Sequence, residues 1–398
     1  MKENYSLYVH FPWCVRKCPY CDFNSHEKPD GIPEQDYIRA LLADLDEDLN
    51  KTFVASNTIE LGSIFMGGGT PSLFSAEGIN YLLDQIRQRV DFSENIEVTM
   101  EVNPGSISQE AHENAPFKSL VSKKHQTELL AAEKLAGFRD AGVNRLSLGV
   151  QSFDASQLRR LGRIHSPESA IRTYELARAA NFRNINIDLM HGLPNQNLTQ
   201  AMSDLQAAID LKPEHISWYQ LTIEPNTVFY KHPPRLPDED ALWQIYEAGL
   251  STLAKNDFLR YEVSAFSRPG YQSEHNLNYW SFGNYLGIGA GAHGKYRQGQ
   301  AFYRSTKTRL PTDYLKGHHP KYKQVPADDL LLEYLMNTMR LVSGFSYQQF
   351  EENTGLSRDV LRSFTEKAKA RSMVIENSNG LQPSPQGLQF LNDLLLLA

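Results

Sequence analysis

The three cysteines of the chain, Cys14, Cys18 and Cys21, are separated by three and two residues. An odd number of cysteines this close together is poorly suited to cross-linking a large fold by disulfides, so the spacing favours a metal centre. Three thiolates on one short loop reach a compact centre at little cost in closure entropy. A cubane iron–sulfur cluster normally has four cysteine ligands, so three would leave one iron open. Structural zinc is the alternative, but it usually takes four protein ligands, and His10 or His26 would have to supply the fourth.

A run of three glycines, Gly67, Gly68 and Gly69, is followed by Thr70 and Pro71. Because glycine has no Cβ, the backbone N–H and carbonyl groups of this run are open to close approach by a ligand. The run is not a phosphate-binding P-loop, since no Gly-Lys-Ser/Thr sequence follows it, and it lacks the G-x-G-x-x-G pattern. A plain tight turn is the alternative interpretation.

The elements that must position these residues follow a repeating strand–helix order between Tyr5 and Leu221. Short β-prone runs predict strands at Ser6–Phe11, Ser63–Met66, Ile96–Val102, Arg145–Val150, Asn184–Met190 and His215–Leu221. Apolar spacing between them predicts helices at Asp36–Leu49, Ala76–Val90, Leu129–Ala141, Pro167–Ala180 and Leu198–Leu211. Six such units predict an α/β fold with a parallel sheet, curved into a partial (β/α)6 barrel of the TIM type.

Four polar residues lie at or just after predicted strands: Glu101 in EVNPG, Gln151 in SLGVQSF, Arg163 in LRRLGRIH and Asp188 in NIDLMHGLP. Any one of them alone could be a solvated surface group or a helix cap. Because the carboxyl ends of parallel strands meet at one edge of a barrel, their recurrence at successive strand ends favours a common site.

The chain divides into a predicted barrel at 1–222, a loop-rich extension with one clear helix at 223–325, and a third domain at 326–398. Within the barrel, residues 106–126 are long for a βα connection and are expected to form a surface excursion. In the third domain, three helical patterns precede a hairpin signal at Asn379-Gly380 and a helix from Pro385, which predicts a winged-helix-like α+β unit. DNA binding is one interpretation, but the mixed charges of this unit favour a structural or substrate-covering role.

Composition sets broad limits on function. The 398 residues suggest two or three domains, and 41% hydrophobic with 22% charged residues is typical of a globular protein. The chain has 40 basic and 47 acidic residues, and its net charge of -7 argues against a surface that coats nucleic acid. No signal-peptide pattern and no apolar run near the roughly 20 residues of a membrane span is present, so we expect a cytoplasmic protein without a membrane span.

The cysteine spacing, the glycine run and the polar strand ends together resemble the radical S-adenosylmethionine (SAM) superfamily, in particular its oxygen-independent coproporphyrinogen III oxidase branch. The resemblance implies a radical SAM barrel with a [4Fe–4S] cluster on the three cysteines. The open iron would chelate the methionine part of SAM, and an electron from the cluster would cleave SAM to a deoxyadenosyl radical. The SAM-binding residues implied are Tyr8, Tyr20 beside the adenine, Gly67, Gly68, Gly69 and Thr70 near the methionine amino group, Glu101 on the ribose, Arg163 on the carboxylate, Gln151 and Asp188.

Within this branch the chain most resembles the heme chaperones, over nearly its whole length. The oxidase has a further cysteine two positions after the third, where this chain has Phe23, and a long amino-terminal arm, where 13 residues precede Cys14. The segment from His275 to Trp280, HNLNYW, matches the HNxxYW motif of the chaperones. This match implies that His275 is an axial ligand of heme iron and that Tyr279 and Trp280 pack on the porphyrin.

The resemblance therefore implies a protein that binds heme and hands it to acceptor hemoproteins, with membrane-bound respiratory enzymes among the candidates, and that does not act on nucleic acid. A coproporphyrinogen oxidase, or another radical SAM enzyme that modifies porphyrins, is the alternative, and the two departures argue against oxidase activity. A regulatory protein acting through the winged helix is a third possibility.

Overall fold

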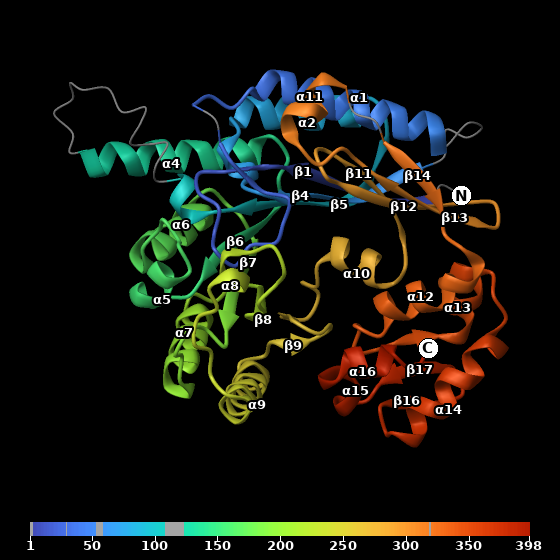
Figure 1. Ribbon diagram of the computed structural model, residues 1–398. Helices are drawn as coiled ribbons and strands as arrows, with labels where there is room; N and C mark the ends of the chain where they lie inside the picture. Colours follow the sequence, from blue (N-terminus) through green and yellow to red (C-terminus); the bar gives the residue numbers. More distant parts are fainter. Residues whose placement is uncertain (1–2, 29, 53–58, 108–122, 318–319) are drawn as a thin grey trace.

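The computed structural model describes residues 3–28, 30–52, 59–107, 123–317 and 320–398 (Figure 1). A sheet of 12 strands with covering helices forms the main body, and a smaller domain with a three-stranded sheet follows it. Most of the expected surface excursion at 106–126 lies outside the described residues. The helix after it already begins at Lys123, earlier than the predicted start.

Six parallel strands form the centre of the large sheet, as predicted. In sheet order they are β1 (Glu3–Phe11), β4 (Ile59–Gly68), β5 (Asp91–Val102), β6 (Arg145–Gln151), β7 (Asn184–His191) and β8 (His215–Gln220). Each strand pairs in parallel with the next one in this order. The arrangement confirms the predicted α/β fold with a partial (β/α)6 barrel.

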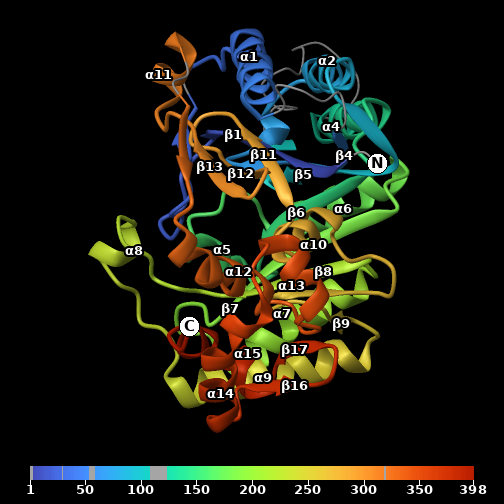
Figure 2. The same ribbon diagram turned by 90° about the vertical axis from the view of Figure 1, so that its right-hand side faces the viewer.

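Helices connect these strands and cover the outer face of the sheet (Figures 1 and 2). The predicted ones are α1 (Glu34–Thr52), α2 (Ala76–Arg87), α4 (Lys123–Asp140), α6 (Pro167–Ala179) and α7 (Leu198–Asp210). As its sequence suggests, α6 begins with a Ser166 cap and a first-turn proline. A short helix, α5 (Ala155–Arg160), was not predicted because six residues are too few to display a helical period.

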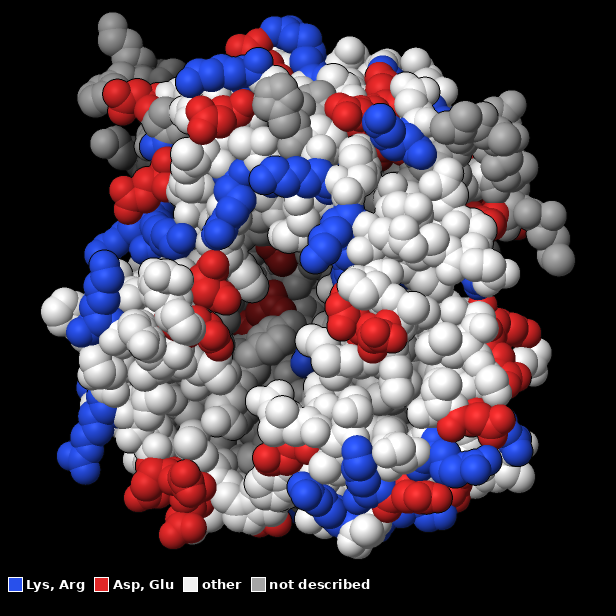
Figure 3. Space-filling model, turned by 45° about the vertical axis from the view of Figure 1, so that its right-hand side comes forward, with Lys and Arg blue, Asp and Glu red and all other residues white. Residues whose placement is uncertain are grey.

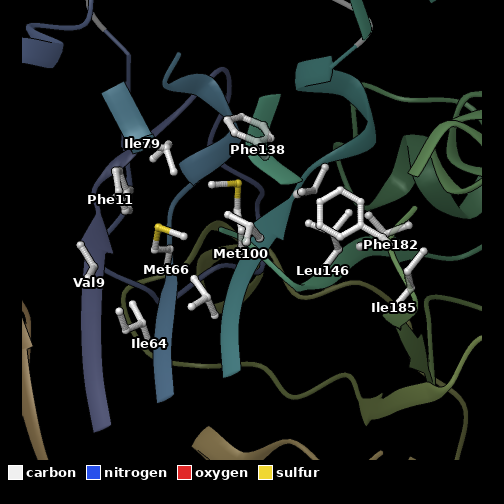
Figure 4. Packing of buried hydrophobic residues seen from close by; sticks show 14 of the residues in the cluster. Val9, Phe11, Ile64, Met66, Ile79, Met100, Phe138, Leu146, Phe182 and Ile185 are labelled. Atoms are coloured by element: carbon white, nitrogen blue, oxygen red, sulfur yellow. The ribbon is translucent and has the colours of Figure 1, made fainter. Parts of the chain in front are cut away.

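Every second residue of a strand points toward the helices, and in this sheet those residues are mostly apolar, so the outer face of the sheet is apolar. Met66, Met100 and Leu146, from three neighbouring strands, pack beneath Ile79 of α2 and Phe138 of α4 (Figure 4). All five side chains are fully buried. Burying each such side chain stabilises the fold by about 1.5–3 kcal/mol, so this layer contributes substantially to the stability of the barrel.

The inner face of the sheet is polar, because the intervening strand residues are polar. The strand register aligns Ser63 with Glu97, Glu101 with Ser147, and Gly149 with Asp188. Many of these groups are buried, so they need hydrogen-bond or ion-pair partners within the protein. The same alternation that builds the apolar core therefore directs the polar residues into the barrel.

The expectation that residues 223–325 form loops around a single helix is wrong. Besides α8 (Val228–Lys231) and α9 (Glu239–Lys255), this segment holds two strands beyond β8, namely β9 (Leu259–Arg260) and β10 (Ala265–Ser267). Four more extend the sheet on the other side of β1: β11 (Asn284–Ile288), β12 (His293–Gln298), β13 (Ala301–Thr306) and β14 (Lys321–Gln324).

These strands escaped prediction for two physical reasons. They are short, so local alternation is weak, and β11 pairs in parallel with β1, which lies far away in the sequence. Two helices complete the segment, α10 (Glu274–Trp280) and α11 (Pro311–Lys316). The segment therefore completes the barrel sheet, and the boundaries at 222 and 325 stay a prediction.

The carboxy-terminal domain has the predicted order of helices and hairpin. Its elements are α12 (Leu330–Thr338), β15 (Phe345–Ser346), α13 (Tyr347–Thr354), α14 (Arg362–Ala370), β16 (Val374–Glu376), β17 (Gly380–Pro383), α15 (Pro385–Gln389) and α16 (Leu391–Leu395). Its core includes Tyr334, Phe350 and Phe364, and it also takes in Phe282 and Phe302 from the preceding segment. None of the helices in the described ranges combines the length and apolarity that crossing a membrane requires.

A buried ion cluster joins α1 to the segment after β13. Lys307 Nζ lies 2.6 Å from Asp44 Oδ1 and 2.5 Å from Asp48 Oδ1, and all three side chains are almost fully inaccessible. The Tyr314 hydroxyl and the Gly289 N–H both donate to Asp44 Oδ2, at 2.8 and 3.0 Å. Because one cation serves two buried carboxyl groups, its removal would leave both of them without compensation.

We expect Lys307→Met to destabilise the protein by about 3–5 kcal/mol, the cost of breaking a buried ion pair from one side. Denaturant unfolding followed by circular dichroism measures this change. Lys316→Met is the matched control, because its ion pair with Asp313 is exposed, and we expect a change within about 0.5 kcal/mol. Equal stability losses in the two variants would contradict the proposed importance of the cluster.

Candidate functional site

A cavity of about 360 Å³ lies at the carboxyl ends of the parallel strands, within the roughly 300–1,000 Å³ typical of small-molecule sites. Figure 3 shows a deep hollow on one side of the molecule, with acidic side chains in its depth and both basic and acidic ones around its rim. Most of the residues predicted from the sequence line the cavity: Cys14, Cys18, Tyr20, Cys21, Gly68, Gly69, Thr70, Glu101, Gln151, Arg163 and Asp188. The barrel thus brings together side chains that are far apart in sequence.

The cysteine loop leaves β1 and folds back through a short parallel pair, β2 (Trp13–Cys14) with β3 (His26–Glu27). Within the loop, the Cys21 N–H donates to the Cys18 carbonyl at 3.1 Å. Lys17 Nζ donates to two further carbonyls of the loop at 3.1 and 3.0 Å. These bonds give the loop a defined shape, with all three cysteines at the cavity wall.

Each thiol lies near one polar group: Cys14 near Thr70 Oγ1 (3.5 Å), Cys18 near Arg163 Nη1 (3.7 Å) and Cys21 near Ser25 Oγ (3.5 Å). Burial raises the pKa of the Cys14 thiol to about 11 and also raises the pKa of Cys21. Both thiols therefore hold their protons at neutral pH, and a metal centre would have to displace those protons on binding.

The geometry gives no support to the zinc alternative. Among the described residues, no group of three or more histidine, cysteine, aspartate or glutamate side chains is placed to hold one metal ion. His10 Nδ1 and Nε2 are engaged by the Tyr8 hydroxyl and the Asn24 carbonyl, both at 2.9 Å. His26 Nε2 lies 3.4 Å from the Asn24 side-chain oxygen. The thiolates of a cubane bind different irons, so they need not converge on one point.

The glycine run at the end of β4 lies directly against the cysteine loop. The Gly69 N–H donates to the Phe11 carbonyl at 2.7 Å, and a Cβ on Gly69 would lie 2.6 Å from the same oxygen. Gly68 has a φ of 103°, and a Cβ there would lie 2.3 Å from the His10 ring. These glycines are therefore required by the close approach of the chain itself, in addition to any role toward a ligand.

Two partly buried carboxyl groups line the cavity, Glu101 from β5 and Asp188 from β7. Glu101 Oε2 accepts the Gly68 N–H at 3.0 Å, while Asp188 accepts from Ser147 Oγ at 2.7 Å and Asn186 Nδ2 at 2.8 Å. Burial, reinforced by the nearby Asp188, raises the pKa of Glu101 to about 8, and burial also raises the pKa of Asp188. At neutral pH the Glu101 carboxyl is therefore largely protonated and can donate as well as accept a hydrogen bond.

Arg163 is fixed at the cavity wall and has an unused donor. Its Nη2 donates to the Gly149 carbonyl at 2.6 Å, whereas its buried Nε has no hydrogen-bond partner among the described residues. The guanidinium as a whole lines the cavity beside Gly149 and Gln151. Gln151, at the end of β6, has a φ of 71°, which is uncommon outside glycine and recurs at functional sites.

Two predicted SAM-binding residues do not line the cavity within the described residues. The Tyr8 ring lies 6.3 Å from the Phe65 ring, and its hydroxyl is engaged by His10. Gly67 has the Phe65 ring beside it, 2.8 Å from where a Cβ would lie. Tyr20 does line the cavity, with its ring 6.4 Å from that of Phe229.

His275 also lies away from the cavity wall, on α10, which packs against β1, β4 and β11. The side chain is nearly buried, with an exposed fraction of 8%. Its Nδ1 lies 3.1 Å from Ser63 Oγ, its ring lies 5.1 Å from the Phe65 ring, and no described residue hydrogen-bonds its Nε2. Burial, together with Arg145, lowers the pKa of His275 to about 3, so the imidazole is neutral, the form that binds metals.

The two aromatic residues of the same motif are half-buried. Tyr279 and Trp280 meet edge to face at 4.8 Å, and Tyr279 also packs on Tyr285. The Arg340 guanidinium, from the carboxy-terminal domain, lies 4.3 Å from the Trp280 ring centre. The motif is therefore held between the barrel and the carboxy-terminal domain.

Comparison with known proteins agrees with this architecture. Residues 8–208 match the radical SAM superfamily, and residues 325–390 match the HemN C-terminal domain. The chain is 47% identical to the heme chaperone HemW of Haemophilus influenzae and 45% identical to that of Escherichia coli, in each case over 98% of this chain and 97% of the relative. The chain belongs to the HemW family of the radical SAM superfamily.

The chain also resembles two proteins with other names at lower sequence identity. The bovine mitochondrial protein named radical S-adenosyl methionine domain-containing protein 1 is 32% identical over 98% of this chain and 86% of its own length. Coproporphyrinogen III oxidase (HemN) of E. coli has the same fold, with a TM-score of 0.77 over 100% of this chain and 90% of HemN, at 18% identity. The expected radical SAM barrel is thereby confirmed.

Several cavity residues of this HemW-family chain were not predicted: Arg16, Asn103, Ser147, Gly149, Met190, Tyr219 and Thr222. The sequence contains a pattern that could have identified some of them as residues of the inner face. Ser147 and Gly149 alternate with Gln151 along β6, and Tyr219 follows Ser217 and His215 at the same spacing in β8. Polar residues at every second position of a strand that is otherwise apolar mark the inner face of such a barrel.

Glu101 predicts a pH dependence of stability. Its pKa is about 8 in the folded state against an ordinary 4.5, so between these values the native protein binds more protons than the unfolded chain. The free energy of unfolding therefore falls as pH rises from about 4.5 to about 8, by up to about 1.4 kcal/mol per pH unit. Glu101→Gln should remove this contribution. Denaturant unfolding of both proteins at pH 5 and pH 8 measures the difference, and equal pH dependences would contradict the assignment.

Proposed function

We propose that this protein is a heme chaperone, which binds a [4Fe–4S] cluster and SAM in the barrel, binds heme, and transfers heme to acceptor hemoproteins. The observation that carries the proposal is 45–47% identity, over almost the entire length, to proteins named heme chaperone HemW. We place it in the cytoplasm, where clustered free thiols stay reduced, with membrane-bound respiratory enzymes among its acceptors.

The cavity supports binding of the cluster and SAM. Cys14, Cys18 and Cys21 would hold three irons, and a bound SAM on the fourth iron would supply radical chemistry after one-electron reduction. The Arg163 guanidinium, which lines the cavity, suits a carboxylate, a charge-assisted contact worth about 1.5–3 kcal/mol. Glu101, with its second oxygen free of any described partner, suits the hydroxyl groups of a ribose.

The environment of His275 supports heme ligation. A neutral imidazole with one nitrogen hydrogen-bonded and the other available is the usual state of a metal-binding histidine. Here Ser63 engages Nδ1, which leaves Nε2 for iron. Tyr279 and Trp280 present half-buried aromatic surface on the same helix, suited to an apolar macrocycle.

Oxidase activity is less well supported. The likeness to HemN concerns the fold, and the position where the oxidase carries its additional cysteine is Phe23, which lies at the cavity with 60% of its surface exposed. An aromatic side chain cannot replace a thiolate, so the chain lacks this feature of the oxidase.

The cluster assignment predicts an effect of Gly69→Ala. The added Cβ would lie 2.6 Å from the Phe11 carbonyl and 2.7 Å from that of Trp13, so the cysteine loop must shift. We expect iron and sulfide content after anaerobic reconstitution to fall by roughly twofold or more, as overpacking displaces the ligands. Gly31→Ala is the control, since nothing lies within 4 Å of its Cβ. Full cluster content in Gly69→Ala would contradict this placement of the loop.

The heme assignment predicts an effect of His275→Ala. Loss of an axial ligand should weaken heme binding by about tenfold or more in titrations followed by absorbance. His232→Ala, an exposed histidine after α8, should bind heme as the wild type does.

Two further assays on the reconstituted protein separate chaperone from oxidase. Heme-loaded protein should restore activity to an apo-hemoprotein, and incubation with coproporphyrinogen, SAM and a reductant should yield no protoporphyrinogen. Rapid decarboxylation would overturn the chaperone proposal. Unchanged heme affinity in His275→Ala would move the ligand elsewhere.

A further inference from the structure

Two serines on neighbouring strands hold the imidazole of His275. Its Nδ1 lies 3.1 Å from Ser63 Oγ on β4, and Ser63 Oγ lies 2.7 Å from Ser6 Oγ on β1. Both serines are at most 2% exposed, so these bonds do not compete with water. If Nε2 binds iron, Nδ1 carries the proton and donates to Ser63, and Ser63 donates to Ser6. The pair therefore fixes the orientation of the ring, and iron on Nε2 would select the tautomer with the proton on Nδ1.

A buried carboxylate holds the backbone of the same helix. Glu97 Oε1 accepts from Ser273 Oγ at 3.1 Å and from the His275 N–H at 3.2 Å, while its Oε2 accepts the Glu274 N–H at 3.1 Å. A carboxylate at a helix N-terminus satisfies amides that have no partner within the helix. Arg145 lies 3.7 Å from Glu97, and both side chains are buried. The position of α10 on the inner face of the sheet is thus set by Glu97.

We propose that Ser63 and Glu97 are positioning residues for heme ligation, Ser63 through the ring of His275 and Glu97 through its helix. This inference rests on the proposed function, since it takes His275 as the axial ligand. Groups that accept a hydrogen bond from the non-ligating ring nitrogen of a metal-binding histidine increase the basicity of the imidazole and fix the orientation of its ring. Ser63 therefore tunes the electron density on the iron, and Glu97 determines whether Nε2 is presented at all.

The two residues should have different signatures. Ser63→Ala removes one hydrogen bond, so heme affinity should fall by about two- to tenfold, and the less basic imidazole should shift the heme reduction potential to more positive values. Ser63→Thr retains the hydroxyl and should restore the wild-type potential. Glu97→Gln removes the charge that three donors share, and its heme affinity should fall by about tenfold or more.

Matched controls exist for both variants. Ser267→Ala removes a buried hydroxyl of β10 that has no hydrogen-bond partner in the described part of the chain. Glu214→Gln changes a mostly buried carboxylate that accepts the Ile185 N–H and pairs with Arg178, away from α10. Both controls should show the wild-type heme affinity and potential. Iron and sulfide content, measured in every variant, reports whether the barrel has folded.

The outcomes separate this inference from the proposed function. If wild type and His275→Ala bind heme equally, the assignment of the ligand fails. If His275→Ala loses affinity while Ser63→Ala keeps the wild-type potential, the role of Ser63 is refuted. Wild-type affinity in Glu97→Gln would likewise refute the role of Glu97, with His275 still the ligand.

Discussion

Removal of polar groups from water on the inner face of the sheet is the constraint on which the rest of this structure depends. The outer face is stabilised simply by apolar burial beneath the helices, but each group on the inner face needs a specific partner. Asp188 is satisfied by Ser147 and Asn186, and Asn186 in turn accepts from His215 and Ser217. At Arg163, Nη2 finds such a partner in the Gly149 carbonyl.

Much of the barrel could be predicted from sequence because its strands and helices have clear local periods. The cysteine loop, the glycine run and the strand-end residues could also be found. They are polar or glycine residues that follow successive predicted strands, and the carboxyl ends of such strands meet at one edge of the barrel. The surroundings of His275 could not be predicted, because its partners, Ser63 and Glu97, are about 200 residues away and belong to strands whose polar residues carry no label of their contacts. The prediction of loops at 223–325 is wrong for the same reason: β11 pairs with the first strand of the chain, a contact that local sequence does not reveal.

One segment links the two ends of the large sheet. Residues 268–283, which include α10, leave β10 beyond one end of the parallel strands and lead to β11 beside β1 at the other. Their contacts with Ser63 and Glu97 place them across the inner face. Tyr261, which precedes this segment, attaches the sheet to the carboxy-terminal domain. Its hydroxyl hydrogen-bonds His215 of β8, and its carbonyl accepts the Val342 N–H. The segment that carries His275 is therefore attached to the inner face of the same sheet whose strand ends form the cavity.

The pairing of β11 with β1 also has a consequence for the order of assembly. During synthesis, the strand that leads into the cysteine loop has an unpaired edge until residues 284–288 have left the ribosome. Pairing across so long a separation is entropically slow, whereas the steps from β1 through β8 link near neighbours in sequence. All the residues that line the cavity lie before Pro225, so they are synthesised before α10. The exposed edge of β1 is therefore the place where an incomplete chain would aggregate.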